Sequence, residues 1–299
     1  MSNQTLPLIQ HPRFEVAFKY IKQCMQCRHS MNSKLGFIVG EAGIGKTRLM
    51  QFVKSRYPVI KEDIADQIPV LAVRCPSRFS ESTFFNAILC AIGAPQRPNA
   101  TAAKLKIQVQ ELLLQHQVKL VLIDEIQDGI PQSGVRDRSQ VVKSLKFLND
   151  ECPCAIVCLG IHTSRSLYDE ESQIKSRCRS PFNMRHFDYQ TKEDKDYWLS
   201  FLLGVFEDLN LPVSKELSFA DLMMSATLGD LRTLERLIVD LNLNAPEKPE
   251  TIDELLDKFN EVWEAYEYDP SRPSPFDLSG SGVSEGLALL PFNQLVQAH

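Results

Sequence analysis

The hydrophobic residues of this chain fall into short unbroken runs, separated by longer segments in which they recur every three or four positions. Unbroken runs are typical of buried parallel strands, and the longer spacing is typical of helices that bury one face. Strands are predicted over residues 35–39, 70–73, 119–125 and 155–160, with a last short strand over 184–189, and helices over 15–29, 82–92, 102–116 and 140–149. This alternation predicts an α/β fold in which a parallel sheet is sandwiched by helices.

After residue 190 the spacing is helical throughout, which predicts a small α-helical lid. Its four expected helices cover residues 192–209, 214–227, 230–243 and 251–266. From residue 269 the chain is rich in Pro, Ser and Gly, which favours a flexible tail, and its apolar end at 287–292 indicates either a partner-docking segment or a frayed terminus. The predicted domains are a helical extension (1–34), an α/β core (35–190), a lid (191–267) and a flexible tail (268–299).

The first predicted strand runs directly into a glycine-rich turn that fits the pattern G-x-x-x-x-G-K-[ST] without a mismatch. Its glycines let successive backbone N–H groups turn inward around a phosphate, and the following helix adds a partial positive charge. Lys46 is expected to reach the β- and γ-phosphates, and Thr47 to place its hydroxyl on Mg²⁺. The residues expected to bind the nucleotide here are Gly40, Glu41, Ala42, Gly43, Ile44, Gly45, Lys46, Thr47 and Arg48.

The third apolar run ends in two acidic residues, Asp124 and Glu125. A central parallel strand delivers such side chains to the carboxyl edge of the sheet, where a phosphate loop opens. Asp124 is expected to hold Mg²⁺ through water, and Glu125 to orient and polarise the attacking water. An acidic pair on the second strand after the phosphate loop is typical of ring- and filament-forming ATPases. The sequence has no Asn-Lys-x-Asp motif for guanine, so ATP is favoured over GTP.

Composition restricts the function less than these motifs do. The 299 residues carry a net charge of −5, but residues from 241 onward hold eleven acids and three basic residues, which leaves residues 1–240 with a net charge of +3. This balance neither demands nor excludes nucleic acid. No apolar run approaches the roughly 20 residues of a membrane span, and the N-terminus has no signal-peptide pattern. We therefore expect a cytoplasmic location, no membrane partner, and eight cysteines that are reduced thiols.

With both motifs placed, the chain resembles the TniB/TnsC family of AAA+ ATPases, which regulate DNA transposition. The similarity lies in His-Pro-Arg-Phe at 11–14, the acidic motif at 122–127, Gln-Ile-Lys-Ser-Arg at 173–177 and Leu-Gly-Asp-Leu-Arg at 228–232. The resemblance implies that Arg177 is an arginine finger acting on the neighbouring subunit's γ-phosphate, a role that Arg179 could share. It likewise implies that Arg232 senses nucleotide from the lid. The alternative for either arginine is a purely structural position at a helix end.

One position departs from the family pattern, which usually has a small polar residue directly after the glycine that ends the fourth strand. Here Gly160 is followed by Ile161, His162 and Thr163. The polar contact that senses the γ-phosphate is therefore either shifted to His162 or Thr163, or lost. Slow hydrolysis that partners stimulate is the expected consequence.

The resemblance also implies that ATP-bound subunits assemble head to tail, as a ring or a filament, on double-stranded DNA. Contacts to phosphates would make binding largely independent of sequence. The implied protein partners are a target-selection protein and a transposase. Two alternatives remain: a helicase or clamp loader, and a nucleotide-controlled signalling scaffold that binds no DNA. The candidate DNA contacts, each of which could instead be an ordinary surface residue, are Arg97, Thr101, Lys104, Lys106, Arg136 and Arg138.

Overall fold

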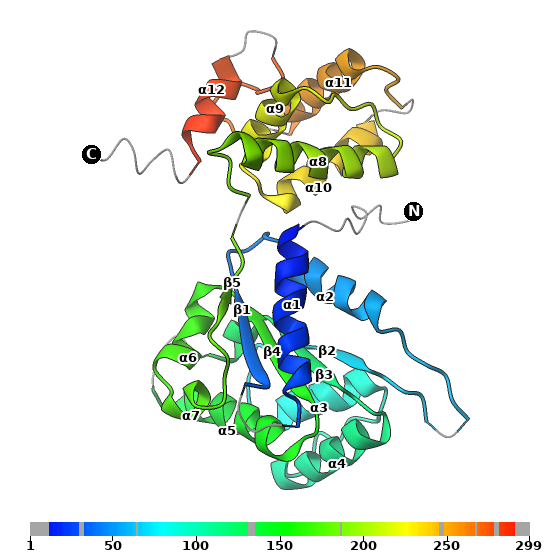
Figure 1. The fold of residues 1–299 in the computed structure, drawn as a ribbon, viewed down its shortest axis with the longest axis vertical. Coiled ribbons are helices and arrows are strands. Elements are labelled where there is room, and N and C mark those ends of the chain that lie inside the picture. The colour runs from blue at the N-terminus through cyan, green and yellow to red at the C-terminus, as the bar shows by residue number, and fades with distance from the viewer. Residues whose placement is uncertain are drawn as a thin grey trace. The chain divides into compact units, whose positions relative to one another are not determined.

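The computed structural model describes residues 12–29, 33–63, 65–130, 135–185, 187–244, 248–266, 268–277 and 281–290. The chain divides into two compact units, of which the first is Pro12–Met184 and the second contains the chain from Arg185 onward (Figure 1). Each unit is described by itself. Among the described residues, no helix has the length and apolar character needed to cross a membrane.

The first unit contains a five-stranded, all-parallel sheet in the order β2-β3-β4-β1-β5. Its strands are β1 (Leu35–Val39), β2 (Val70–Arg74), β3 (Leu120–Asp124), β4 (Ala155–Gly160) and β5 (Phe182–Asn183). The first four lie where the apolar runs predicted them. β3 is separated from β1 by β4, so the acidic strand and the glycine-rich turn belong to strands that are not neighbours.

The prediction of the last strand over 184–189 is wrong, because β5 consists of only two residues, Phe182 and Asn183. The amide of Met184 still donates to the carbonyl of Val39 at 2.7 Å, and the chain then leaves the sheet. Phe187 and Tyr189 are buried in the hydrophobic cluster of the second unit. Their apolar character reflects packing among helices and not strand pairing.

Helices cover both faces of the sheet, as Figure 1 shows. Alternate residues of β1 point to opposite faces: Phe37 joins one hydrophobic cluster and Ile38 the other. The Phe37 cluster is completed by α3 (Glu81–Ile92), α4 (Ala102–Gln115), α5 (Val135–Glu151), α6 (Ser166–Asp169) and α7 (Ser172–Lys175). The Ile38 cluster is completed by α1 (Pro12–Gln26) and α2 (Lys46–Arg56).

The N-terminal helix α1 is a layer of this first unit. A Cβ at Gly36 of β1 would lie 2.9 Å from both the Cys24 sulfur and the Tyr20 hydroxyl oxygen, so the missing side chain lets the helix approach the strand closely. The Tyr20 hydroxyl accepts a hydrogen bond from the Phe37 amide at 3.2 Å. The helical extension predicted for residues 1–34 therefore contains a helix that helps to bury the sheet.

The second unit is built from helices α8 (Lys192–Asp208), α9 (Leu217–Thr227), α10 (Leu231–Asn244), α11 (Ile252–Ala265) and α12 (Ser281–Ala288). The first four match the predicted lid helices to within three residues at each end. The core of this unit is aromatic: the fully buried Trp198 lies 4.7 Å from the Phe187 ring, centroid to centroid.

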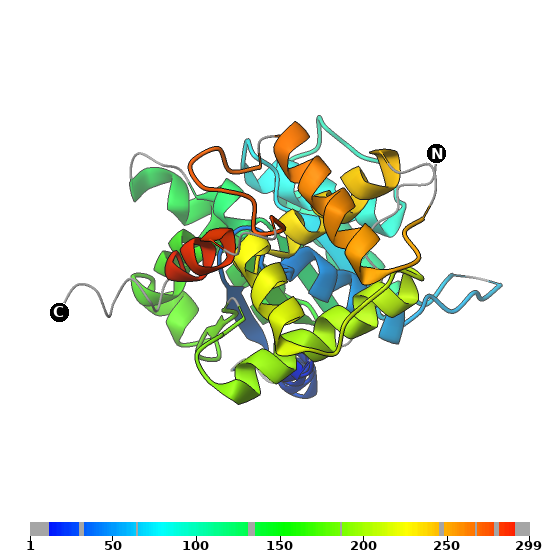
Figure 2. The same ribbon diagram turned by 90° about the horizontal axis from the view of Figure 1, so that it is seen from above.

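The described part of the predicted flexible tail is packed against this unit. Phe276 is 3% exposed and stacks on Phe259 with ring centroids 5.1 Å apart. Helix α12 lies along α9 (Figures 1 and 2), where a Cβ at Gly286 would come within 2.0 Å of the Ser225 hydroxyl. Glycines that suggest a linker in the sequence thus permit close helix contact. Within the apolar segment 287–292, Leu290 is 2% exposed and unavailable for docking, and residues 291–292 lie outside the described chain.

The two units can be followed separately during unfolding, because all eight cysteines lie in the first and both tryptophans in the second. Ile21 of α1 is fully buried against the sheet. We expect Ile21→Ala to lower the free energy of unfolding of the first unit by about 3 kcal/mol, because it leaves a cavity. Thiol labelling during urea denaturation measures this loss. Val16→Ala, at a 54% exposed position of the same helix, is the control and should change the value by less than about 0.5 kcal/mol.

Candidate nucleotide-binding site

The glycine-rich turn joins the end of β1 to the start of α2, and its three glycines are needed for two different reasons. Gly43 and Gly45 have φ of 87° and 94°, in the left-handed region that favours glycine. A Cβ at Gly40 would lie 2.5 Å from the carbonyl oxygen of Met184. Gly45 precedes the first turn of α2 without a side-chain cap, which leaves backbone N–H groups for an anion.

Lys46 extends over this turn from the first position of α2. Its side chain is largely buried, and Nζ donates to the carbonyl oxygens of Gly40 at 2.9 Å and of Glu41 at 2.7 Å. The ammonium group is therefore held at the cradle formed by the turn. Glycines that a Cβ would block, an uncapped helix start and a positive charge together fit a bound triphosphate.

The hydroxyl of Thr47 donates to Oδ2 of Asp124 at 3.1 Å, which brings α2 and the end of β3 together. Asp124 is 7% exposed. Burial raises the pKa of its carboxyl, while the hydrogen bond from Thr47 acts in the opposite direction. A hydroxyl and a carboxylate are hard oxygen donors, so this pair fits Mg²⁺.

Glu125 follows at the point where β3 turns into the short 3₁₀ helix η1 (Ile126–Gly129). Its φ is 53°, an uncommon value for a residue other than glycine, and its amide donates to Oδ1 of Asp124 at 3.0 Å. Its carboxylate accepts a hydrogen bond from the side-chain amide of Gln127. Gln127 lies within the acidic motif that the sequence analysis quoted, but its contact depends on this turn and was not predicted.

Arg177 lies near the amino ends of the parallel strands, opposite the end that carries the phosphate loop. Its carbonyl oxygen accepts from the amide of Ser33, and the next residue, Cys178, bridges Leu35 at the start of β1, whereas the phosphate loop follows the end of β1. The guanidinium pairs with Asp150 through two bonds, Nε to Oδ1 at 2.8 Å and Nη2 to Oδ2 at 3.0 Å. Although burial opposes ionisation, the hydrogen bond from Arg177 lowers the pKa of Asp150. Arg177 therefore does not belong to the phosphate site of its own chain.

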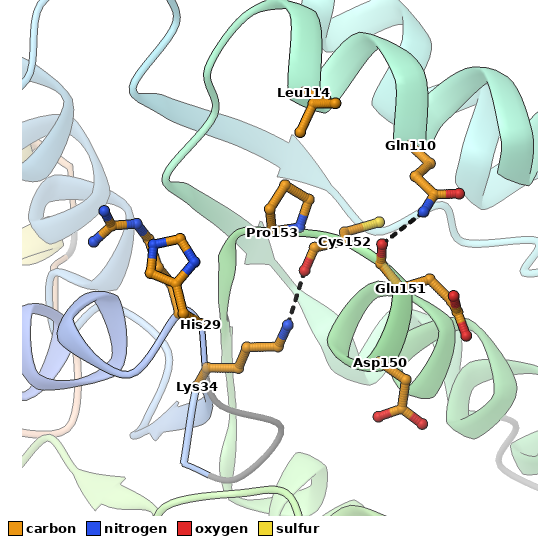
Figure 3. Close-up of a pocket in the computed structure, with 9 residues that line it drawn as sticks. His29, Lys34, Gln110, Leu114, Asp150, Glu151, Cys152 and Pro153 are labelled. Atoms are coloured by element: carbon orange, nitrogen blue, oxygen red, sulfur yellow. Dashed lines mark hydrogen bonds between the residues drawn. The ribbon is translucent and has the colours of Figure 1, made fainter.

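Asp150 of this ion pair also lines a groove of about 340 Å³ (Figure 3). The buried Lys34 lines it as well, and Lys34 Nζ donates to the carbonyl oxygen of Cys152 at 2.8 Å. Burial lowers the pKa of Lys34. Arg179, the other candidate for the role of arginine finger, has different contacts: its Nη2 donates to the side-chain oxygen of Gln23 at 3.2 Å.

The candidate DNA contacts are not equivalent in the structure. Lys106 pairs with Glu81 at 2.8 Å, and Arg138 pairs with Glu170. Thr101 caps α4 by accepting from the amide of Lys104 at 3.4 Å.

Two of the candidates remain together on one open surface. Arg97 and the exposed Lys104 line a shallow groove of about 450 Å³ along α4. The side chain of Arg136 lies outside the described residues.

The residues predicted to sense the nucleotide, His162 or Thr163 and Arg232, lie in different units of the chain. His162 and Thr163 are exposed on the short helix η2 (His162–Arg165), which follows β4. Arg232 lies in the first turn of α10 in the second unit, where its amide donates to Oδ1 of Asp230 at 3.1 Å.

The strand order, the glycine-rich loop and the acidic pair define an AAA+ ATPase domain. Comparison with solved structures shows the same fold. A Walker-type ATPase of Pyrococcus abyssi matches with a TM-score of 0.58 at 15% identity, over 87% of this chain and 73% of that one. The Aeropyrum pernix ORC2 protein, in ADPNP–ADP complexes, matches with a TM-score of 0.55 at 16% identity, over 99% and 73%. The Aeropyrum pernix ORC1 protein, in complex with DNA, matches with 0.54 at 13%, over 86% and 66%.

The chain belongs to the TniB family: the family described as bacterial TniB protein matches residues 4–188. The resemblance noted in the sequence is thereby confirmed. Comparison with curated protein sequences found no match.

Because Asp124 is buried, its charged carboxylate destabilises the nucleotide-free protein. Folding raises the pKa of the Asp124 carboxyl, so the folded state favours its protonated form. The wild type therefore loses stability as pH rises through that raised pKa. We expect Asp124→Asn to raise the unfolding temperature at neutral pH, since the uncharged amide can accept from the Glu125 N–H and donate to the Thr47 hydroxyl. The gain should disappear in acid, and the variant should gain less stability than wild type from ATP with Mg²⁺. Thermal unfolding across pH measures both effects, with Asp128→Asn as control; an unstabilised Asp124→Asn at neutral pH would contradict the prediction.

Proposed function

We propose that this chain is an ATP-dependent, DNA-binding regulator of transposition. In its ATP-bound form it oligomerises on target duplex DNA and links a target-selection protein to the transposase. The observation that carries the proposal is membership of the TniB family over residues 4–188, in a chain that keeps a complete phosphate loop and acidic pair. The structural similarity to an ORC1 protein in complex with DNA is consistent with a DNA-associated role.

The proposed division of labour at the nucleotide follows from the contacts in the first unit. Lys46 exchanges its bonds to the loop carbonyls for phosphate oxygens, which keeps the ammonium group paired in both states. Thr47 and Asp124 would hold Mg²⁺, which neutralises phosphate charge when bound. Glu125, beside Asp124 at the sheet edge, orients and polarises the attacking water.

The position of Arg177 supports a head-to-tail oligomer. Its guanidinium is at the sheet edge where β1 begins, so the nucleotide that it reaches is that of a neighbouring subunit. Such a heterologous interface closes a ring or continues as a helical filament. To reach a neighbour's nucleotide, Arg177 must leave Asp150 and bind phosphate instead. The carboxylate and the phosphate are both anions that can accept two hydrogen bonds from the guanidinium. This competition supports slow hydrolysis until assembly is complete.

We propose Arg97 and Lys104 as the first DNA contacts to test, together with Arg136. Arg97 and Lys104 share one open surface, whereas Lys106 and Arg138 are held in ion pairs. Repetition along a filament lets a few cations per subunit suffice. For the partner-docking segment, the packing of Phe276 and Leu290 means that a truncation test should begin after Leu290 and not at residue 270.

Nucleotide-gated DNA binding is the first function to measure. Wild type should bind a random-sequence fluorescent duplex cooperatively with ATP, weakly with ADP, and less tightly as salt increases. Lys46→Ala should reduce ATP-dependent binding by at least about tenfold because the phosphates lose their cation. Lys54→Ala, which removes an exposed lysine from the same helix, is the matched control.

The other outcomes discriminate between functions. ATP turnover without DNA binding under any nucleotide condition would replace the proposal with a protein-only signalling scaffold. Binding that requires a replication clamp or a fork would indicate a clamp loader or helicase.

The trans role of Arg177 predicts complementation between two inactive variants. Arg177→Ala and Glu125→Gln should each lower ATP turnover by at least about a hundredfold. In an equimolar mixture, roughly a quarter of interfaces combine an intact Glu125 with a neighbour's intact Arg177, so turnover should recover toward that fraction. Arg179→Ala, two residues from the finger, is the control and should keep its turnover. A mixture no more active than the separate variants would exclude action in trans.

A further inference from the structure

The side chain of Gln127 connects two parts of the nucleotide site, the turn that follows β3 and the end of β4. Its Nε2 group donates to the carboxylate of Glu125, and its Oε1 accepts from the backbone amide of Ile161 at 3.2 Å. The orientation of the amide is fixed by its partners, because a backbone N–H can only donate and a carboxylate can only accept. A side chain with a donor and an acceptor on the same carbon is therefore required at this position.

The contact with Ile161 leads back to the phosphate loop. Gly160, the last residue of β4, accepts a hydrogen bond through its carbonyl oxygen from the amide of Gly40 at 3.1 Å. The connection runs from the first residue of the loop to the end of β4 and then through Gln127 to Glu125. A displacement of the loop on binding phosphate thus has a short route to the carboxylate that acts on water.

Gly160 also makes room for the Gln127 side chain. A Cβ at this position would lie 2.7 Å from Oε1 of Gln127 and 2.7 Å from the Ser164 hydroxyl. The absence of a side chain at residue 160 is therefore what lets the glutamine amide reach the backbone of Ile161.

We propose that Gln127 is a positioning residue that holds the Glu125 carboxylate and couples it to the end of β4. This inference rests on the proposed ATPase function and deepens it. In this chain the residue directly after Gly160 is Ile161, whose side chain is apolar, and His162 and Thr163 are exposed. The backbone amide of Ile161, through Gln127, is the polar group by which the end of β4 acts on Glu125.

Three substitutions separate the parts of this connection. Gln127→Met keeps the size of the side chain and removes both hydrogen bonds. Gln127→Glu keeps an acceptor for the Ile161 amide, removes the donor to Glu125 and places a second carboxylate beside it. Gly160→Ala leaves Gln127 in place and crowds its oxygen. Gln67→Met is the matched control, since the amide of the half-buried Gln67 also donates to a glutamate carboxylate, that of the exposed Glu62.

Each variant is compared with wild type by steady-state ATP hydrolysis at saturating ATP, with and without duplex DNA, and by direct binding of a fluorescent ATP analogue. All three substitutions should lower kcat by about tenfold or more, because Glu125 loses its orientation, while affinity for the analogue stays within about twofold. Gln67→Met should match wild type in both. An equal loss of affinity and kcat, or a kcat within twofold of wild type for Gln127→Met and Gln127→Glu, would overturn the inference.

Amide hydrogen exchange at Ile161 in the nucleotide-free protein gives a readout that does not depend on activity. Exchange should be faster in Gln127→Met and Gly160→Ala, and should remain slow in Gln127→Glu. Unchanged exchange in all variants would also overturn the inference. Wild-type protein that binds ATP without turnover would overturn the proposed ATPase function as well, whereas turnover without DNA binding would contradict only the proposed DNA role.

Discussion

The nucleotide site depends on one constraint, the alignment of the carboxyl ends of β1, β3 and β4 at a single edge of a parallel sheet. This alignment lets Thr47, which follows β1, bond Asp124 at the end of β3, although β4 lies between the two strands. The same alignment buries Asp124 and raises the pKa of its carboxyl. A carboxylate kept charged in such a place is a cost to the fold that a bound cation would offset.

Local pattern and strand sequence were enough to predict most of the first unit. Buried parallel strands are apolar at every position, so β1 to β4 were visible as runs, and the glycine-rich turn has a fixed spacing. β5 was misplaced because Phe187 and Tyr189 are apolar for a different reason, namely burial in the second unit. Periodicity reports that a residue is buried but does not identify the element that buries it.

The features that the sequence analysis missed depend on contacts between segments distant along the chain. Gly282 and Gly286 lie in a stretch with the composition of a linker, but the Gly282 carbonyl accepts from Ser225 of α9, and a Cβ at Gly286 would collide with the same serine. Gln127 is two residues from Glu125, yet its function depends on the amide of Ile161, 34 residues away, and on the missing side chain of Gly160. Neither contact has a signal in local spacing, because each requires the strand order of the sheet or the packing of helices to be known first.

In the proposed assembly, the two ends of the parallel strands divide the reaction between subunits. The carboxyl ends of the strands carry the phosphate loop and Glu125, whereas Arg177 lies near the start of β1, so the proposed finger does not face the nucleotide site of its own chain. Asp150 keeps the Arg177 charge paired in the isolated chain, which avoids an uncompensated guanidinium at a half-buried position. For Arg177 to act in trans as proposed, a neighbour's phosphate must compete with a carboxylate already held by two hydrogen bonds. On this proposal, hydrolysis depends on how well the interface presents that phosphate, and its rate is set by the assembly more than by the single chain.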